Sequence, residues 1–335
     1  YRMSTILDPH AAQSDYDAMV KGWFDRNMPD LNQQNRHLAT YLKQNSVWWI
    51  EFGGIRGIRM DTQPYADRYF MSNWAKYIMS EYPYFNIVGE SWSGTPAIVA
   101  YFQGGRIQHD GYNSNIPAVF DFPLFDAVGE AFRDESPGWN TGMLRIYNSI
   151  AQDFLYANPF NMVVFGDNHD TDRILRRLGE NTDNLKMAIA LLTTTRGIPL
   201  FYTGTELLNS AYEWEGHGLL RANFPGGWAG DPINAFTREG RTDQQNAVHD
   251  YLTKLLNYRK NNEVLQTGKL MQFLPESDVY VYFRYNDKAT VMVVINSNNQ
   301  DMQLNTARFK EATKKFSKAK DIIGGQQFEI GRAHV

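Results

Sequence analysis

The chain has 335 residues, of which 43% are hydrophobic and 21% are charged, and its formal net charge is −4 at pH 7. This length exceeds one average domain and the composition is that of a globular protein, so two domains are expected. The slight negative charge disfavours nucleic-acid binding by a basic surface, and no apolar run approaches the ~18 residues that span a bilayer. With no cysteine, disulfides and thiolate metal sites are excluded.

Strand and helix signals alternate over most of the chain. Hydrophobic periodicity and turn residues predict, in chain order, helix 36–52, strand 57–61, helix 67–79, strand 86–90, helix 96–102, strand 118–122, a largely helical stretch 123–155, strand 161–166, helix 184–195, strand 197–204 and helix 243–260. An irregular segment is expected before residue 36, and a break is expected at Pro137-Gly138. Alternation of this kind indicates βα units and a parallel sheet, so the predicted fold class is α/β.

The pattern changes near the C-terminus. Residues 279–285 and 290–296 are two β-rich runs that flank an Asn-Asp-Lys turn, which predicts an antiparallel hairpin. We therefore expect two domains, an α/β domain with a parallel sheet over 1–262 and a C-terminal β-sandwich domain over 263–335.

Aromatic residues are the unusual class, with 20 Phe, 19 Tyr and 8 Trp making up 14% of the chain. Most of them are expected to pack in the core. The functional alternative is sugar binding, because Tyr and Trp combine a flat apolar face with a polar group.

Three of the predicted strands lead into carboxylates, namely Asp61, Glu90 and Asp170. Catalytic groups of a parallel barrel lie at the C-terminal ends of its strands. Two acids that flank one bond are the usual equipment for glycoside hydrolysis. A single Asp after a strand is more often a helix cap or a turn former, but three such strands in order favour an active site.

Asp61 has a cation two residues before it. Strand alternation places Arg59 and Asp61 on the same face, so the guanidinium can lie beside the carboxylate. An adjacent cation keeps the carboxylate ionised, which suits a nucleophile. The alternative is a purely structural internal salt bridge.

Glu90 follows an apolar strand and lies between Gly89 and Trp92. A carboxyl group in a partly apolar setting has a raised pKa, so it can stay protonated and act as a general acid.

The segment Asn168-His169-Asp170 offers an amide, an imidazole and a carboxylate at one strand end. A metal site with His169 and Asp170 as ligands is one alternative, which is disfavoured because no second His lies nearby at helical spacing. A turn with a hydrogen-bonded histidine is the other.

Together these segments resemble the α-amylase superfamily, the (β/α)8 TIM-barrel glycoside hydrolases of family 13. The matching segments are 28–32 for the motif in the loop after strand 3, 57–61 for strand 4, 88–90 for strand 5, 165–170 for strand 7 and 197–206 for strand 8. The resemblance covers roughly residues 25–262. Within the family, the segments 28–32 and 225–228 are most similar to neopullulanases and cyclomaltodextrinases.

The resemblance implies a nucleophile, Asp61, an acid/base, Glu90, and a transition-state stabiliser, Asp170. It also implies substrate contacts by Arg59, Tyr65, Trp92, Asn168 and His169. The implied reaction is retaining cleavage of α-1,4-glucosidic bonds in starch-derived maltooligosaccharides, pullulan or cyclodextrins, with the two carboxyls about 5–5.5 Å apart. Two alternatives stay open: an α-glucan transglycosylase of the same superfamily, and a catalytically inactive starch-binding or structural fragment.

The resemblance also implies that part of the barrel is missing. The fourth barrel strand already begins at residue 57, although one βα unit takes roughly 30 residues of a barrel of about 250. We expect a C-terminal fragment that lacks strands 1–3 and holds strands 4–8. The implied partner is an α-glucan oligosaccharide, with a homodimer as an option. No cofactor is required, no metal site is expected here, and calcium is an option only in the full-length enzyme. The sequence leaves the compartment open, while the resemblance favours a periplasmic or secreted protein.

Overall fold

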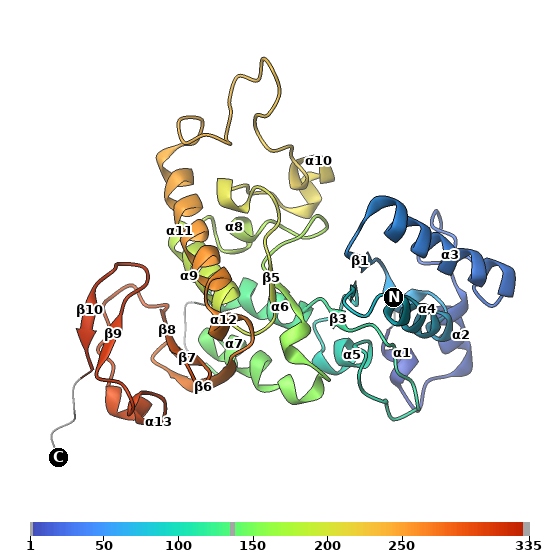
Figure 1. The fold of residues 1–335 in the computed structure, drawn as a ribbon, viewed down its shortest axis with the longest axis horizontal. Coiled ribbons are helices and arrows are strands. Elements are labelled where there is room, and N and C mark those ends of the chain that lie inside the picture. Colours follow the sequence, from blue (N-terminus) through green and yellow to red (C-terminus); the bar gives the residue numbers. More distant parts are fainter. Residues whose placement is uncertain (1–2, 135–137, 331–335) are drawn as a thin grey trace. The chain divides into compact units, whose positions relative to one another are not determined.

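The computed structural model describes residues 3–134 and 138–330. The chain forms two compact units (Figure 1). The first unit comprises the chain up to Asp126 together with Ser149–Phe165, and the second unit comprises Ala127–Asn148 together with the chain from Gly166 onward. Within the described residues, no helix is both long and apolar enough to cross a membrane.

A parallel sheet organises the first unit. Its strands are hydrogen-bonded in the order β1 (Gly57–Met60), β2 (Asn86–Gly89) and β3 (Ala118–Val119). A parallel bridge between Phe120 and Val163 continues the pairing toward β4 (Val163–Phe165). These strands therefore follow one another in chain order, as the strands of a βα barrel do.

Five helices of the described chain belong to the first unit with this sheet. They are α1 (Ser4–Leu7), α2 (Gln13–Lys21), α3 (Arg36–Gly53), α4 (Arg68–Glu81) and α5 (Pro96–Tyr101). The N-terminus of α4 is capped by Asp67, whose Oδ1 accepts a hydrogen bond from the Phe70 N–H at 2.8 Å. The buried face of α4, which includes Trp74 and Ile78, packs with Ile87 of β2 in one apolar cluster.

The second unit contains the remaining helices and two antiparallel sheets. The elements after β4 are α8 (Ile174–Arg177), α9 (Thr182–Thr194), β5 (Ile198–Leu200), α10 (His217–Leu220), α11 (Asp243–Lys260), α12 (Glu263–Gln266), β6 (Lys269–Glu276), β7 (Val279–Tyr285), β8 (Thr290–Asn296), α13 (Lys310–Thr313), β9 (Lys318–Lys320) and β10 (Gln327–Glu329). β7 lies between β6 and β8 in the larger sheet, and β9 pairs with β10. α6 (Phe122–Ala131) and α7 (Met143–Ala151) contain the points where the chain passes from one unit to the other.

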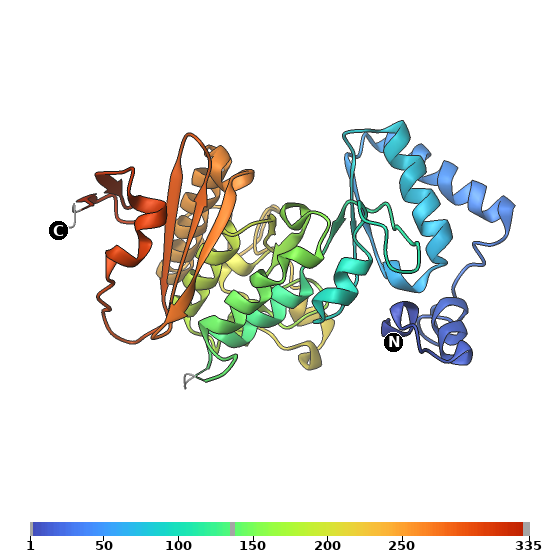
Figure 2. The same ribbon diagram turned by 90° about the horizontal axis from the view of Figure 1, so that it is seen from below.

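Buried arginines tie the C-terminal sheet to the helices of the second unit. The β6–β8 sheet lies beside α9 and α12 (Figure 2). Arg284 of β7 donates to the carbonyls of Thr194 and Thr195 at the end of α9, at 3.0 and 2.5 Å. Arg259 of α11 donates to the nearby Gly197 carbonyl at 2.6 Å. Arg284 thus satisfies carbonyls that the end of α9 leaves unpaired.

The structure confirms the predicted alternation of strands and helices and the C-terminal hairpin. It differs in extent at several places. The segment expected to be irregular before residue 36 contains α2, and β6 was not predicted. The strand predicted over 118–122 stops at Val119, because Phe122 already begins α6. Pro137 of the predicted break lies outside the described residues. The domain boundary after residue 262 stays a prediction.

Candidate active site

Asp61 and Glu90 follow neighbouring strands of the first unit. The parallel register pairs Met60 with Gly89, so the next residue of each strand, Asp61 or Glu90, reaches the same edge of the sheet. Arg59 lies between them: its Nη1 is 3.2 Å from Asp61 Oδ2, and its Nη2 is 2.5 Å from Glu90 Oε1. The predicted Arg59–Asp61 neighbourhood is present, and the same guanidinium also serves Glu90.

The two carboxylates have different surroundings. The Glu90 side chain is 7% exposed, whereas that of Asp61 is 63% exposed. Burial raises the pKa of Glu90 to about 7, and the hydrogen bond to Asp61 acts in the same direction. The Arg59 charge and the Thr62 N–H, at 3.2 Å from Glu90 Oε2, oppose this rise. Glu90 can therefore exchange a proton near neutral pH beside a solvated carboxylate.

A tight turn after β1 holds the Thr62 N–H against Glu90. Thr62 adopts the left-handed conformation with φ of 48°, which is unfavourable for a β-branched residue. The next side chain, Gln63, is buried, donates to the Phe102 carbonyl at 3.0 Å and accepts from Ser91 Oγ at 3.4 Å. A Cβ at position 89 would lie only 1.6 Å from Gln63 Oε1, so this packing requires Gly89.

Two predicted substrate-contact aromatics also lie in the first unit. Trp92 is 44% exposed and stacks on Phe122, with ring centroids 5.1 Å apart. Tyr65 contacts Phe24 edge to face at 4.9 Å. Trp92 thus packs against Phe122 while part of its indole ring stays exposed to solvent.

The turn that carries Asp170 belongs to the second unit. Asn168 Oδ1 accepts a hydrogen bond from the Asp170 N–H at 2.8 Å, and His169 Nε2 lies 3.0 Å from Asp170 Oδ2. Arg221 fixes the other side: its Nη2 is 2.6 Å from Asp170 Oδ1, and its Nε donates to the His169 carbonyl at 2.9 Å. Sequence reasoning missed Arg221, which lies 51 residues after Asp170.

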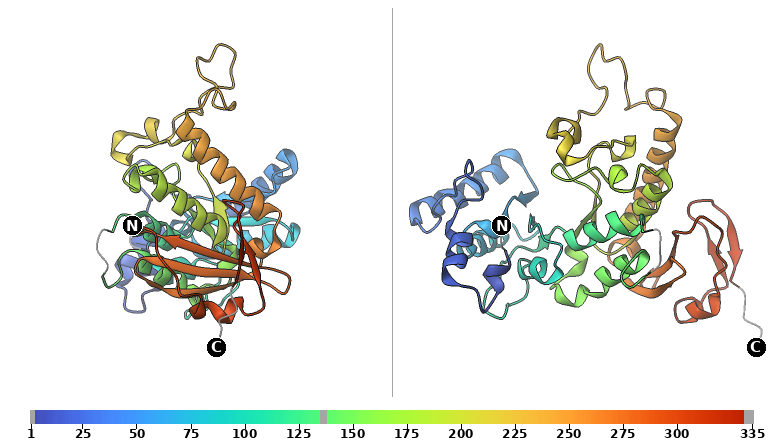
Figure 3. Two further views of the ribbon diagram at one scale, coloured as in Figure 1. Left: turned by 90° about the vertical axis from the view of Figure 1, so that its left-hand side faces the viewer. Right: turned by 180° about the vertical axis from the view of Figure 1, so that it is seen from behind.

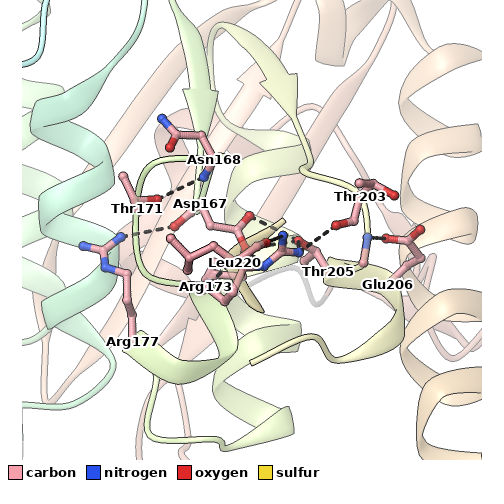
Figure 4. Close-up of polar contacts among 12 residues, drawn as sticks. Asp167, Asn168, Thr171, Arg173, Arg177, Thr203, Thr205, Glu206 and Leu220 are labelled. Carbon is pink, nitrogen blue, oxygen red and sulfur yellow. Dashed lines mark hydrogen bonds and ion pairs between the residues drawn. The ribbon is translucent and has the colours of Figure 1, made fainter. Parts of the chain in front are cut away.

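Asp167 anchors this turn from below (Figure 4). Its carboxylate is buried and lies 3.0 Å from Arg173 Nε, while its two oxygens accept from the Ile174 N–H at 3.0 Å and the Thr205 hydroxyl at 3.1 Å. Burial raises the pKa of Asp167, and the Arg173 charge opposes that rise. Arg173 also donates to the Thr203 carbonyl at 2.8 Å. Asp167 is therefore a structural carboxylate, enclosed by its own partners.

The structure thus brings together Arg59, Asp61 and Glu90 in the first unit, and places the segment 168–170 with Arg221 in the second. Over 3–134 and 138–330, no cluster of three or more His, Asp or Glu side chains is placed to hold a metal ion.

Comparison with known proteins identifies the family. Residues 15–222 match the α-amylase catalytic domain, and residues 270–334 match the cyclo-malto-dextrinase C-terminal domain. An α-amylase of Niallia circulans is 29% identical over 294 residues, which cover 86% of this chain and 49% of that protein. A cyclomaltodextrin glucanotransferase of Thermoanaerobacterium thermosulfurigenes is 30% identical over 285 residues, which cover 84% of this chain and 35% of that protein. The chain spans about half or less of the length of these relatives.

Solved structures show the same fold. An Anoxybacillus α-amylase superposes with a TM-score of 0.68 at 25% identity, covering 90% of this chain and 60% of that one. The α-amylase of Geobacillus thermoleovorans in complex with acarbose gives a TM-score of 0.73 at 24% identity, covering 94% of this chain and 64% of that one. They confirm the predicted partial (β/α)8 barrel followed by an antiparallel β domain. The chain belongs to the α-amylase family, glycoside hydrolase family 13.

Proposed function

We propose that the protein is a retaining glycosidase that cleaves α-1,4-glucosidic bonds of starch-derived glucans. The observation that carries this proposal is the pairing of Glu90, whose pKa burial raises to about 7, with the exposed, Arg59-bound Asp61. The buried carboxyl group can then donate a proton while its solvated neighbour acts as the nucleophile, which are the two roles that glycoside hydrolysis requires.

The proposed reaction has two steps. Glu90 protonates the glycosidic oxygen as the C–O bond breaks, and Asp61 attacks the anomeric carbon to form a covalent glycosyl ester. Glu90, now ionised, removes a proton from water, which attacks the same carbon and releases Asp61. The hydrogen bond between the two carboxyls supports retention, because the carboxyls of inverting enzymes lie roughly 6.5–9.5 Å apart.

The family resemblance supplies the remaining roles. Asp170 is proposed to hydrogen-bond sugar hydroxyls more strongly as the oxocarbenium-like state develops, with His169 and Asn168 beside it. Arg59, Tyr65 and Trp92 are proposed to contact the substrate. No step involves a metal, and calcium binding, a homodimer and a periplasmic or secreted location stay predictions.

The finer assignment is a neopullulanase- or cyclomaltodextrinase-like enzyme, with pullulan, cyclodextrins or linear maltooligosaccharides as substrates. The match of residues 270–334 to the cyclo-malto-dextrinase C-terminal domain supports it.

A transglycosylase is the second candidate, because a relative at 30% identity is a cyclomaltodextrin glucanotransferase. Transfer would use the same glycosyl ester, with a sugar hydroxyl in place of water.

Incubation with maltoheptaose tests these proposals. Hydrolysis raises the number of reducing ends, whereas transfer redistributes chain lengths without that rise. Asp61→Asn and Glu90→Gln are expected to abolish both reactions while the circular dichroism spectrum stays unchanged. Release of a β-anomer as the first product, seen by proton NMR, would contradict retention. Maltoheptaose that remains intact would favour an inactive, binding or structural role.

A further inference from the structure

A long loop joins α10 to α11 in the second unit and stands out in two views (Figures 1 and 3). We call residues 223–236 of this connection the aromatic loop. Its two arms line a hollow of about 700 Å³, whose walls include Phe224, Trp228 and Ile233 together with Asn223 and Asp231. This volume lies within the roughly 300–1,000 Å³ that is typical of small-molecule sites.

The aromatic loop has a defined internal structure. The Ala235 N–H donates to the Pro225 carbonyl at 2.9 Å, which joins its two arms. Gly226 has a φ of 101°, and a Cβ there would lie 2.6 Å from the Asn234 Cα, so only glycine allows the arms to approach. Gly227 lies against the Phe236 ring in the same way, at 3.2 Å for an added Cβ.

This backbone presents the Trp228 ring to solvent. The Trp228 side chain is 83% exposed. The backbone N–H of Trp228 donates to Asp231 Oδ2 at 2.9 Å. Phe224 and Phe236 pack together in the same loop, with ring centroids 4.4 Å apart, and Phe236 is also largely exposed. The hollow therefore combines an accessible indole face with an amide and a carboxylate.

The base of the aromatic loop is fixed to the candidate site residues of the second unit. Arg221, two residues before the loop, binds Asp170 Oδ1 and the His169 carbonyl. The carbonyl of Leu220 accepts from Arg173 Nη1 at 3.3 Å, and Arg173 pairs with Asp167 (Figure 4). Leu220 and Arg221, which lead into the aromatic loop, are therefore fixed by contacts with the segment that carries Asp170.

We propose that the aromatic loop binds a pyranose ring of an α-glucan, with the ring stacked on Trp228 and its hydroxyls paired with Asn223 and Asp231. A sugar has an apolar C–H face and a rim of hydroxyl groups, which match an exposed indole beside polar acceptors and donors. The Asp231 charge disfavours an anionic ligand. This inference rests on the proposed function, since it identifies an additional contact between the protein and the glucan substrate of that reaction.

The test is calorimetric titration of maltoheptaose into the Glu90→Gln protein, in which turnover is blocked. Adding Trp228→Ala is expected to weaken affinity at least about fivefold, which corresponds to the loss of roughly 1 kcal/mol of stacking. Trp228→Phe should keep most of the affinity, because a flat ring remains.

Trp139→Ala is the matched control, since Trp139 is a fully exposed tryptophan of the same unit outside the aromatic loop. It should leave affinity unchanged. Both indoles are exposed, so neither substitution should leave a cavity in the core. Unchanged melting temperatures would verify that both variants stay folded. Equal affinity with and without Trp228, an equal loss in the Trp139 variant, or no binding by the Glu90→Gln protein would overturn the proposal.

Reducing-sugar release by the unsubstituted protein separates this inference from the proposed function. Release with the same KM in the Trp228→Ala protein overturns the role of the aromatic loop alone. Trp228-dependent binding without any release supports the loop and overturns the proposed hydrolysis.

Discussion

Glu90 in the first unit and Asp167 in the second are both buried carboxylates whose pKa burial raises, yet their surroundings differ. Asp167 pairs with Arg173 and accepts hydrogen bonds from a backbone N–H and a hydroxyl. Glu90 shares Arg59 with a second carboxylate, Asp61, to which it is also hydrogen-bonded. Losing a partner is costly for a buried, paired carboxylate such as Asp167. A carboxyl group whose pKa is raised toward 7 beside a second acid is instead a candidate for proton transfer.

Removing the cation from Asp167 should have the largest effect on stability. Arg173→Ala is expected to lower the free energy of unfolding by about 3–5 kcal/mol, because Asp167 would stay buried without its counter-charge. Urea unfolding measures this loss. Arg238→Ala is the control, since the Arg238–Asp250 pair is exposed and its loss should leave stability essentially unchanged. Similar stabilities for the two variants would contradict the structural role of Asp167.

The turn beside Glu90 depends on the fit between Gly89 and Gln63. Gly89→Ala is expected to lower the free energy of unfolding by about 1–3 kcal/mol, because the new methyl group overlaps the buried Gln63 amide. Gln63→Ala makes room for that methyl group, so the loss in the double variant should be smaller than the sum of the single losses. Additive losses in urea unfolding would show that the two positions do not contact.

The pH dependence of stability distinguishes Glu90 from an ordinary glutamate. Its pKa in the folded protein, about 7, lies above its unfolded value, so its contribution to stability is complete at pH 4 and is lost as the pH rises through 7. Glu90→Gln removes this pH-dependent loss. Between pH 5 and pH 8, the free energy of unfolding of the variant should therefore rise by about 1–2 kcal/mol relative to that of the parent, after discounting for solvent access. The same difference in free energy of unfolding between the two proteins at pH 5 and at pH 8 would contradict the raised pKa.

The smallest effect is expected at Arg221. Arg221 is half exposed where it binds Asp170, so Arg221→Ala should lower the free energy of unfolding by no more than about 1 kcal/mol. Arg173 is nearly fully buried in the same region, so comparing Arg173→Ala with Arg221→Ala contrasts a buried and a half-exposed arginine. A loss at Arg221 as large as that at Arg173 would show that Asp170 is structural in the way that Asp167 is.

The carboxylates at the strand ends were predictable, because apolar runs locate buried strands and parallel strands bring their carboxyl ends to one edge. Arg59 was found from strand alternation alone. Gln63 and Arg221 could not be found in this way, because each acts through a residue far away in the sequence. Gln63 contacts Phe102, and Arg221 contacts Asp170. Strand β6 was missed for a similar reason, because its pairing with β7 decides its conformation more than its own mixed polar and apolar pattern does.

Titration of the Glu90 carboxyl by NMR, with ¹³C-labelled glutamate, tests the proposed acid/base role most directly. One glutamate signal should titrate with a pKa near 7, be absent from the Glu90→Gln protein, and shift to lower pH in the Asp61→Asn protein. Titration of every glutamate signal near the ordinary value of about 4.3 would contradict the assignment of Glu90 as the proton donor.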